Sequence, residues 1–109
     1  MCDGQRIVTR RHPIAVAFLL EIPGFTPEQS AAVLHELGLD KNPAAGQIFH
    51  LEGPMDGGMR VVDVWESPEA FQAFVQERLA AAFQKVGFTF PADMQPKAVW
   101  PVTGILMVK

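Results

Sequence analysis

Asp63 is the residue of this chain best placed to do chemistry. It stands in an apolar β-branched run beside Val62 and Val64, where an unpaired carboxylate would be costly to bury. The functional interpretation is a general base or an anchor for a substrate. The structural interpretation is an ion pair with Arg78, which interrupts the apolar stripe of a predicted helix. Both stay open, so Asp63 is a candidate catalytic residue and Arg78 a candidate substrate-binding residue.

His50 is the second candidate catalytic residue. A histidine side chain exchanges protons near neutral pH and can also hydrogen-bond a ligand oxygen. The structural alternative is a polar partner for a backbone or carboxylate group.

Trp65 is a candidate substrate-binding residue, because an indole ring can stack on a flat ligand; equally, it is a large side chain suited to the core. Strand alternation places Asp63 and Trp65 on one face of the predicted strand 59–65. If the preceding hairpin pairs residue 53 with residue 58, His50 and Glu52 share that face. A slip of one residue would reverse the assignment.

The elements that must position these residues are indicated by apolar periodicity, caps and breakers. Strands are predicted at 13–22, 47–52, 59–65 and 97–108, the last in two parts, 97–102 and 105–108. One predicted helix begins at the capping sequence Thr26-Pro27-Glu28-Gln29 and ends at Gly38. A second follows Ser67-Pro68-Glu69 and continues to Gly87.

The order of these elements is β-α-β-β-α-β, which predicts an α+β, ferredoxin-like fold. Right-handed crossovers produce a four-stranded antiparallel sheet, ordered 4-1-3-2, with both helices on one face. We expect residues 13–109 to form this single domain and residues 1–12 to form a flexible N-terminal arm. The opposite face of the sheet has no cover within the chain, so we expect a homodimer.

Composition limits the partners and the compartment. The chain has 109 residues and a net charge of −3, which argues against a nucleic-acid partner. The apolar run from Ile14 to Leu20 is far shorter than the ~18 residues that a membrane span needs. Cys2 is the only cysteine, which fits a reducing cytoplasm. No metal-ligand spacing or nucleotide-binding motif is present, so we expect no metal and no cofactor.

The segment VDVWESPEAFQAF, from Val62 to Phe74, resembles the strand-to-helix junction of the antibiotic-biosynthesis-monooxygenase-like superfamily. This resemblance implies a dimeric α/β barrel. It also implies an activity among the small enzymes of that superfamily, which include oxygenases that need no cofactor. The haem-degrading branch has an Asn on the first strand and a His on the second helix. This chain has no such Asn, and Val75 falls near the position of the His, so haem degradation is not expected.

Two functions are therefore considered. The first is a homodimeric, cofactor-independent monooxygenase-like enzyme acting on a small aromatic or enolisable compound. The second is a non-catalytic ligand-binding or structural dimer of the same fold. A closed apolar pocket containing His50 or Asp63 is the observation that would separate the two functions, and the enzyme interpretation fails if side chains fill the space below Trp65.

Overall fold

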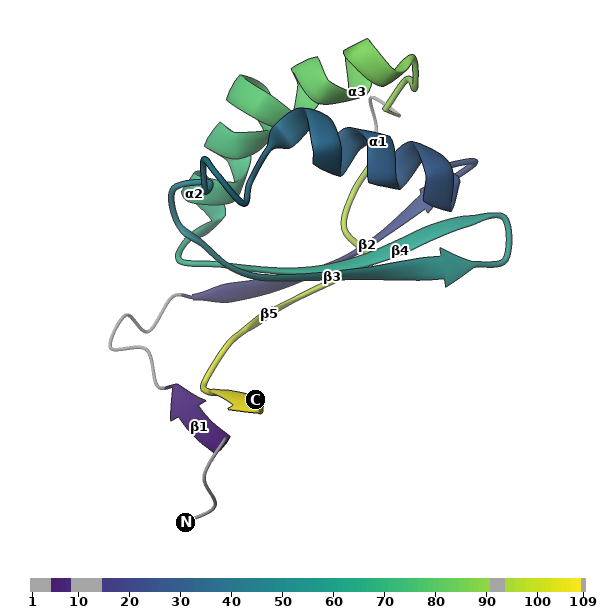
Figure 1. The fold of residues 1–109 in the computed structure, drawn as a ribbon. Coiled ribbons are helices and arrows are strands. Elements are labelled where there is room, and N and C mark those ends of the chain that lie inside the picture. The colour runs from purple at the N-terminus through teal and green to yellow at the C-terminus, as the bar shows by residue number, and fades with distance from the viewer. Residues whose placement is uncertain (1–4, 9–14, 91–93, 109) are drawn as a thin grey trace.

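The computed structural model describes residues 5–8, 15–90 and 94–108 (Figure 1). The main sheet contains β2 (Val16–Pro23), β3 (Gln47–Met55), β4 (Gly58–Trp65) and β5 (Ala98–Pro101). The helical elements are α1 (Pro27–Leu37), α2 (Pro68–Phe74), the π-helical segment η1 (Val75–Leu79) and α3 (Ala80–Val86). Two further strands, β1 (Gln5–Val8) and β6 (Ile105–Val108), form a separate antiparallel pair.

The four-stranded sheet has the order β3-β4-β2-β5, and its register pairs are antiparallel. If the four strands of this sheet are numbered 1 to 4 along the chain, as in the sequence analysis, their order across the sheet is 2-3-1-4. Read from the opposite edge, this is the predicted order 4-1-3-2. All the helices lie over one face of the sheet (Figure 1). The predicted ferredoxin-like fold is therefore confirmed, and β3 is an edge strand.

The N-terminal arm predicted at residues 1–12 is described only at Gln5–Val8. These residues form β1, a strand that the sequence analysis did not predict, and they pair with β6 in the register Gln5 with Val108. The rest of the predicted arm lies outside the described residues.

Both helix starts follow the predicted capping chemistry. Thr26 Oγ1 accepts a hydrogen bond from the Gln29 backbone N–H at 3.1 Å, and the Gln29 side chain accepts one from the Thr26 N–H at 3.0 Å. Ser67 Oγ accepts a bond from the Ala70 N–H at 3.1 Å. These side chains satisfy backbone donors that have no partner within the first helical turn.

The second helix is not the continuous α-helix that was predicted. At η1 the Ala80 N–H donates to the Val75 carbonyl, the wider spacing of a π-helix. On a continuous α-helix, turning by about 100° per residue, Phe74 and Phe83 would lie about 180° apart. The extra residue in η1 reduces this to about 80°, so both rings are buried against the sheet.

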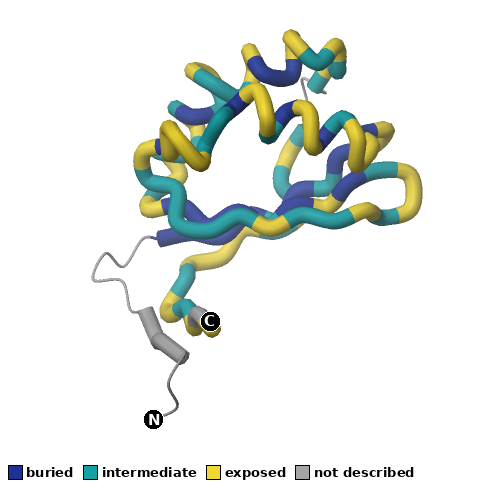
Figure 2. Tube along the Cα trace, in the orientation of Figure 1, coloured by how far each residue is buried: buried dark blue, intermediate teal, exposed yellow. Residues whose placement is uncertain are grey.

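The core fills the space between the helices and the sheet (Figure 2). Alternate residues of β2 and β4 point into it, and the largest fully buried side chain is Trp65. The strands β3 and β4 continue to a two-residue turn at Asp56 and Gly57, so the hairpin is tighter than the 53–58 connection that was predicted. Among the described residues, no helix has the length and apolar character needed to cross a bilayer.

Candidate functional site

His50 and Asp63 occupy directly opposite positions on β3 and β4. The His50 Nδ1 atom lies 2.6 Å from Asp63 Oδ1, a distance typical of a charge-assisted hydrogen bond. The predicted pairing of residue 53 with residue 58 was wrong by two residues, since Gly53 pairs with Arg60. Because side chains alternate with a period of two, a two-residue error preserves the face. His50 and Asp63 therefore share a face, as predicted.

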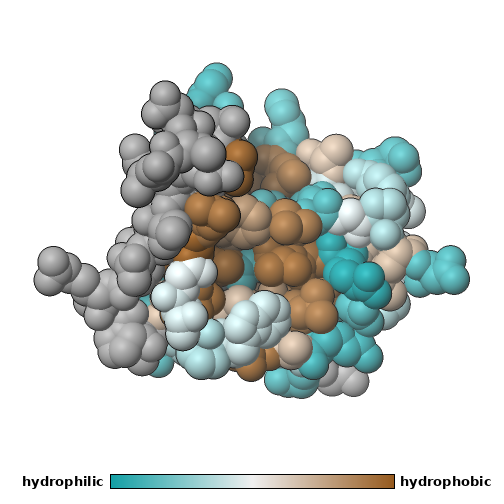
Figure 3. All heavy atoms as spheres, turned by 90° about the horizontal axis from the view of Figure 1, so that it is seen from below, coloured by the Kyte–Doolittle hydropathy of each residue, from teal (hydrophilic) through white to brown (hydrophobic). Residues whose placement is uncertain are grey.

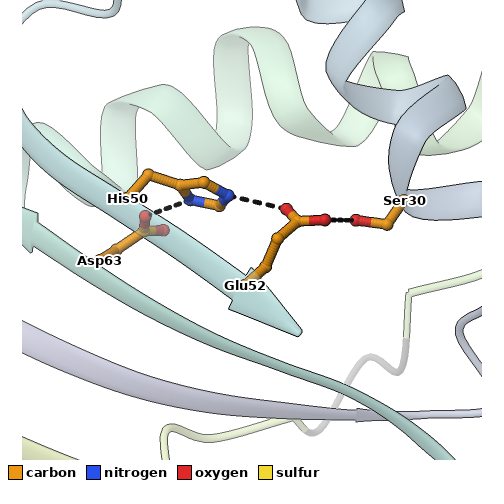
Figure 4. A network of polar contacts seen from close by, with 4 residues as sticks. All are labelled: Ser30, His50, Glu52 and Asp63. Carbon is orange, nitrogen blue, oxygen red and sulfur yellow. Dashed lines mark hydrogen bonds and ion pairs between the residues drawn. The ribbon is translucent and has the colours of Figure 1, made fainter. Parts of the chain in front are cut away.

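Glu52 continues this line of polar contacts on the other side of His50; the line from Asp63 through His50 and Glu52 to Ser30 is called the polar chain below. Its Oε1 atom lies 2.7 Å from His50 Nε2, and its Oε2 atom accepts a hydrogen bond from the Ser30 hydroxyl of α1 (Figure 4). The four residues form one continuous line from β4 through β3 to the helix layer. Both ring nitrogens of His50 are therefore hydrogen-bonded to carboxylates.

These contacts make His50 a cation at neutral pH. The hydrogen bond that His50 donates to Asp63 raises the pKa of His50 most strongly, while burial opposes this increase. The negative charges of Asp63 and Glu52 and the Glu52 hydrogen bond raise the pKa further, to about 9. The protonated ring donates Nδ1–H to Asp63 and Nε2–H to Glu52.

The polar chain forms one wall of an otherwise apolar cavity of about 60 Å³ between the sheet and the helices. Ser30, His50, Glu52 and Asp63 all line it, together with Gln47. The remaining lining is apolar and comes from every layer of the fold: Leu20, Ile22, Phe25, Val33, Leu34, Leu37, Leu39, Val61, Phe74, Leu79, Phe83 and Phe90. A buried polar chain facing an apolar space is the usual composition of a small-molecule site.

Trp65 is not part of this cavity. Its side chain is fully buried, and its ring packs against those of Phe71 and Phe74, with centroids 5.5 Å and 5.0 Å away. The space next to Trp65 is thus filled by side chains, which is the condition stated above against the enzyme. The condition stated for the enzyme, an apolar pocket containing His50 or Asp63, is met by the separate cavity. The structure places Trp65 in the core, as one of its two interpretations had it.

The expected ion pair between Asp63 and Arg78 is wrong. One guanidinium nitrogen of Arg78 donates to the carbonyl of Leu37 at 2.8 Å and to that of Asn42 at 2.9 Å. The guanidinium carbon also lies 5.9 Å from the centre of the Phe74 ring. The prediction assumed an α-helical period, whereas Arg78 lies in η1 and reaches the end of α1 instead. Arg78 does not line the cavity.

The sequence analysis missed the roles of Ser30 and Glu52. Glu52 was placed on the correct face but was not identified as a site residue. Ser30 could have been identified from its position in the sequence. It lies one turn before Val33 and Leu34, on the side of α1 that faces the core. A polar residue at such a position needs a partner. In the part of the chain that is described, no three His, Cys, Asp or Glu side chains are grouped to hold a metal ion.

Comparisons by sequence find no relative: no family model matches the chain, and no curated protein matches it. Solved structures do match. A hydroxynitrile lyase from Passiflora edulis superposes with a TM-score of 0.53 and 15% identity, over 84% of this chain and 95% of that one. A conserved protein from Methanosarcina mazei Go1 has a TM-score of 0.53 and 9% identity, over 82% and 93% of the two chains.

A third structure comes from Chloroflexus aurantiacus J-10-fl and is assigned to the antibiotic biosynthesis monooxygenases. It has a TM-score of 0.51 and 15% identity, over 84% of this chain and 93% of that chain. At such low identity the likeness establishes the fold alone. The resemblance seen at the strand-to-helix junction therefore holds at the level of architecture: this chain has the ferredoxin-like fold of these proteins.

Proposed function

We propose that the protein binds a small, largely apolar compound in the cavity beside His50 and transfers a proton on it. The observation that carries this proposal is the imidazole of His50, hydrogen-bonded between two carboxylates in the wall of an apolar cavity. Acid–base catalysis commonly uses two titratable side chains that differ in charge and lie in a site of low polarity.

Each polar residue has a distinct role in this proposal. The Glu52 carboxylate accepts a proton from a hydroxyl group or an activated carbon of the substrate. The His50 Nε2–H then donates a hydrogen bond to the negative charge that develops on the substrate. Asp63 is a positioning residue, because its bond to Nδ1 orients the ring and keeps it protonated. Return of the proton from Glu52 completes the cycle.

The size of the cavity limits the substrate. A cavity of roughly 150 Å³ is known to hold benzene, whereas one water needs about 10–15 Å³. The volume of about 60 Å³ lies between these values. Of the small aromatic and enolisable compounds expected from the sequence, the cavity favours an enolisable aliphatic compound.

A monooxygenase-like reaction would use this proton transfer as its first step. Deprotonation of a CH₂ group would generate a carbanion that reacts with dioxygen. The product would be a carbonyl group, with water formed from the second oxygen atom and the two hydrogens. The neighbour assigned to the antibiotic biosynthesis monooxygenases supports this form of the proposal through the shared fold.

The second candidate is a ligand-binding or structural protein without catalysis. Two observations favour it: both nitrogens of His50 already have partners, and Phe71 and Phe74 fill the space next to Trp65. In this case the polar chain would only join β4, β3 and α1.

Hydrogen–deuterium exchange of small hydroxyketones in D₂O, followed by NMR with and without dioxygen, separates the two functions. We expect exchange catalysed by the wild-type protein and a loss of about 10²–10⁴-fold in Glu52→Gln. The matched control is Glu21→Gln, because Glu21 has the same fractional exposure as Glu52 to within a per cent but lies away from the cavity. Equal rates in wild type and Glu52→Gln would reject the enzyme.

We also propose that the protein is a homodimer through the sheet face opposite the helices. Leu51 follows His50 on β3 and so points away from the cavity, and Trp100 lies on the same face through its pairing with Ala17. Their exposed fractions are 50% and 43%. Apolar side chains gather over this face (Figure 3). A contiguous apolar patch of this kind supports an interface between copies.

A further inference from the structure

The polar wall of the cavity carries an excess of negative charge. Asp63 and Glu52 are acidic and His50 is the one cation beside them, so the three groups have a formal charge of −1. The side chains of Asp63 and Glu52 are only 7% and 20% exposed, so solvent screens this charge weakly.

In the part of the wall formed by described residues, no positive charge balances this excess. Among the described residues that line the cavity, none is Lys or Arg, and Gln47 is the polar residue outside the chain of four. Arg78, which the sequence analysis placed beside Asp63, instead donates hydrogen bonds to the backbone carbonyls of Leu37 and Asn42. An anionic ligand would therefore meet net repulsion as well as loss of its hydration.

The contact between Ser30 and Glu52 indicates which chemical groups of a ligand this wall can bind. Glu52 lines the cavity, and a hydroxyl donor from α1, that of Ser30, occupies its Oε2 acceptor. Ser30 also lines the cavity and is 3% exposed, so this contact is shielded from solvent. A ligand with its own O–H or N–H could take the same acceptor position.

We propose that the ligand of this cavity is a small aliphatic compound with a hydrogen-bond donor, a hydroxyl or an ammonium group, that replaces Ser30 as a donor to Glu52. This inference names the substrate class of the proposed function and rests on the same cavity. It excludes carboxylates and phosphates as ligands. It also assigns Ser30 as a competitor for the ligand position at Glu52.

The experiment is an NMR titration of the wild-type protein with ethylamine, ethanol and acetate, which share a two-carbon body small enough for the cavity and differ in the polar group. Backbone signals near Ser30 and Glu52 and the ring signals of His50 report binding. We expect both donors to bind, the amine at least about tenfold more tightly than acetate. Acetate binding equal to or tighter than the donors, or no binding by any of the three, would overturn the proposal.

Two variants test the role of each partner. Ser30→Ala frees the acceptor and should tighten binding of both donors severalfold, whereas a purely structural serine would leave these affinities unchanged or weaker. Glu52→Gln removes one negative charge and should abolish the preference for the amine over acetate. Glu21→Gln removes an acid of equal exposure and should preserve it.

Failure of this inference and failure of the proposed function give different results. Selective binding of donors without any exchange or turnover would leave the ligand class standing and reject catalysis. Turnover of a carboxylate or phosphate would support catalysis and reject the ligand class.

Discussion

His50 on β3 and Asp63 on β4 are paired across the hairpin, with Nδ1 and Oδ1 2.6 Å apart. The two strands that carry them are consecutive and joined by a two-residue turn, so their alignment depends on few intervening residues. The pair holds the imidazole in one orientation and in its charged form.

The first prediction concerns the titration of His50. Its ring signals should titrate with a midpoint of about 9 instead of the ordinary 6.5. Asp63→Asn removes the largest cause of the increase and should lower the midpoint by more than one pH unit. Glu21→Gln is the control and should leave it unchanged. A wild-type midpoint near 6.5 would mean that the ring is not bonded to these carboxylates in solution.

The second prediction concerns stability as a function of pH. The folded protein binds the His50 proton more tightly than the unfolded chain, so this stabilisation is complete below pH 6.5 and is lost as the pH rises through about 9. The shift corresponds to roughly 3 kcal/mol as an upper bound. Chemical denaturation at pH 6 and pH 10 measures the loss. In His50→Gln this decrease should be absent, and an equal decrease in both proteins would contradict the assignment.

The third prediction concerns Arg78. Replacement by Met keeps the apolar part of the side chain but removes the donors to the carbonyls of Leu37 and Asn42. We expect a loss of about 1–3 kcal/mol in the free energy of unfolding. The pKa of His50 should stay at its wild-type value, because Arg78 does not contact the polar chain. A large increase in that pKa, the result expected when a nearby positive charge is removed, would restore Arg78 to the site.

The fourth prediction compares two glycines of the β3–β4 hairpin. A Cβ atom at position 58 would lie 3.0 Å from the carbonyl carbon of Ile22 and closer still to its oxygen, whereas a Cβ at position 53 meets nothing within 4 Å. Gly58→Ala should therefore cost about 3 kcal/mol, since the backbone of β2 would have to move. Gly53→Ala should be nearly neutral. Equal midpoints of thermal unfolding would contradict the close approach.

The fifth prediction tests the homodimer. Leu51→Lys and Trp100→Lys each place a charge on the open sheet face and should shift the protein from dimer to monomer in sedimentation or light scattering. Gln72→Lys, on the exposed surface of α2, should leave the mass unchanged. A monomeric wild-type protein at micromolar concentration would reject the interface.

The architecture could be predicted because its determinants are local. The Thr26 and Ser67 caps, the glycines at the helix ends and the alternating strands each depend on a few neighbouring residues. The shared face of His50 and Asp63 was also predictable, since it requires only the parity of the hairpin register. Their direct pairing was not, because it required the turn at Asp56 and Gly57 to be located to the residue.

The remaining parts of the site depend on contacts between elements far apart in the sequence. The bond between Ser30 and Glu52 joins α1 to β3, and no local pattern indicates it. Arg78 was assigned to Asp63 because η1 was read as ordinary α-helix. Trp65 was correctly placed on the same face as Asp63, but whether Phe71 and Phe74 would cover it depends on three-dimensional packing.

The length of the turn at Asp56 and Gly57 sets the register of β3 against β4, and this register brings the members of the polar chain together. If one residue were inserted there and the turn kept two residues, the register of β3 against β4 would shift by one, and His50 and Glu52 would move to the open face of the sheet. An insertion of two residues would let each strand extend by one residue and would leave His50 opposite Asp63. Among proteins of this fold, a difference in hairpin length can therefore be a difference in chemistry, even though the turn itself touches none of the reacting groups.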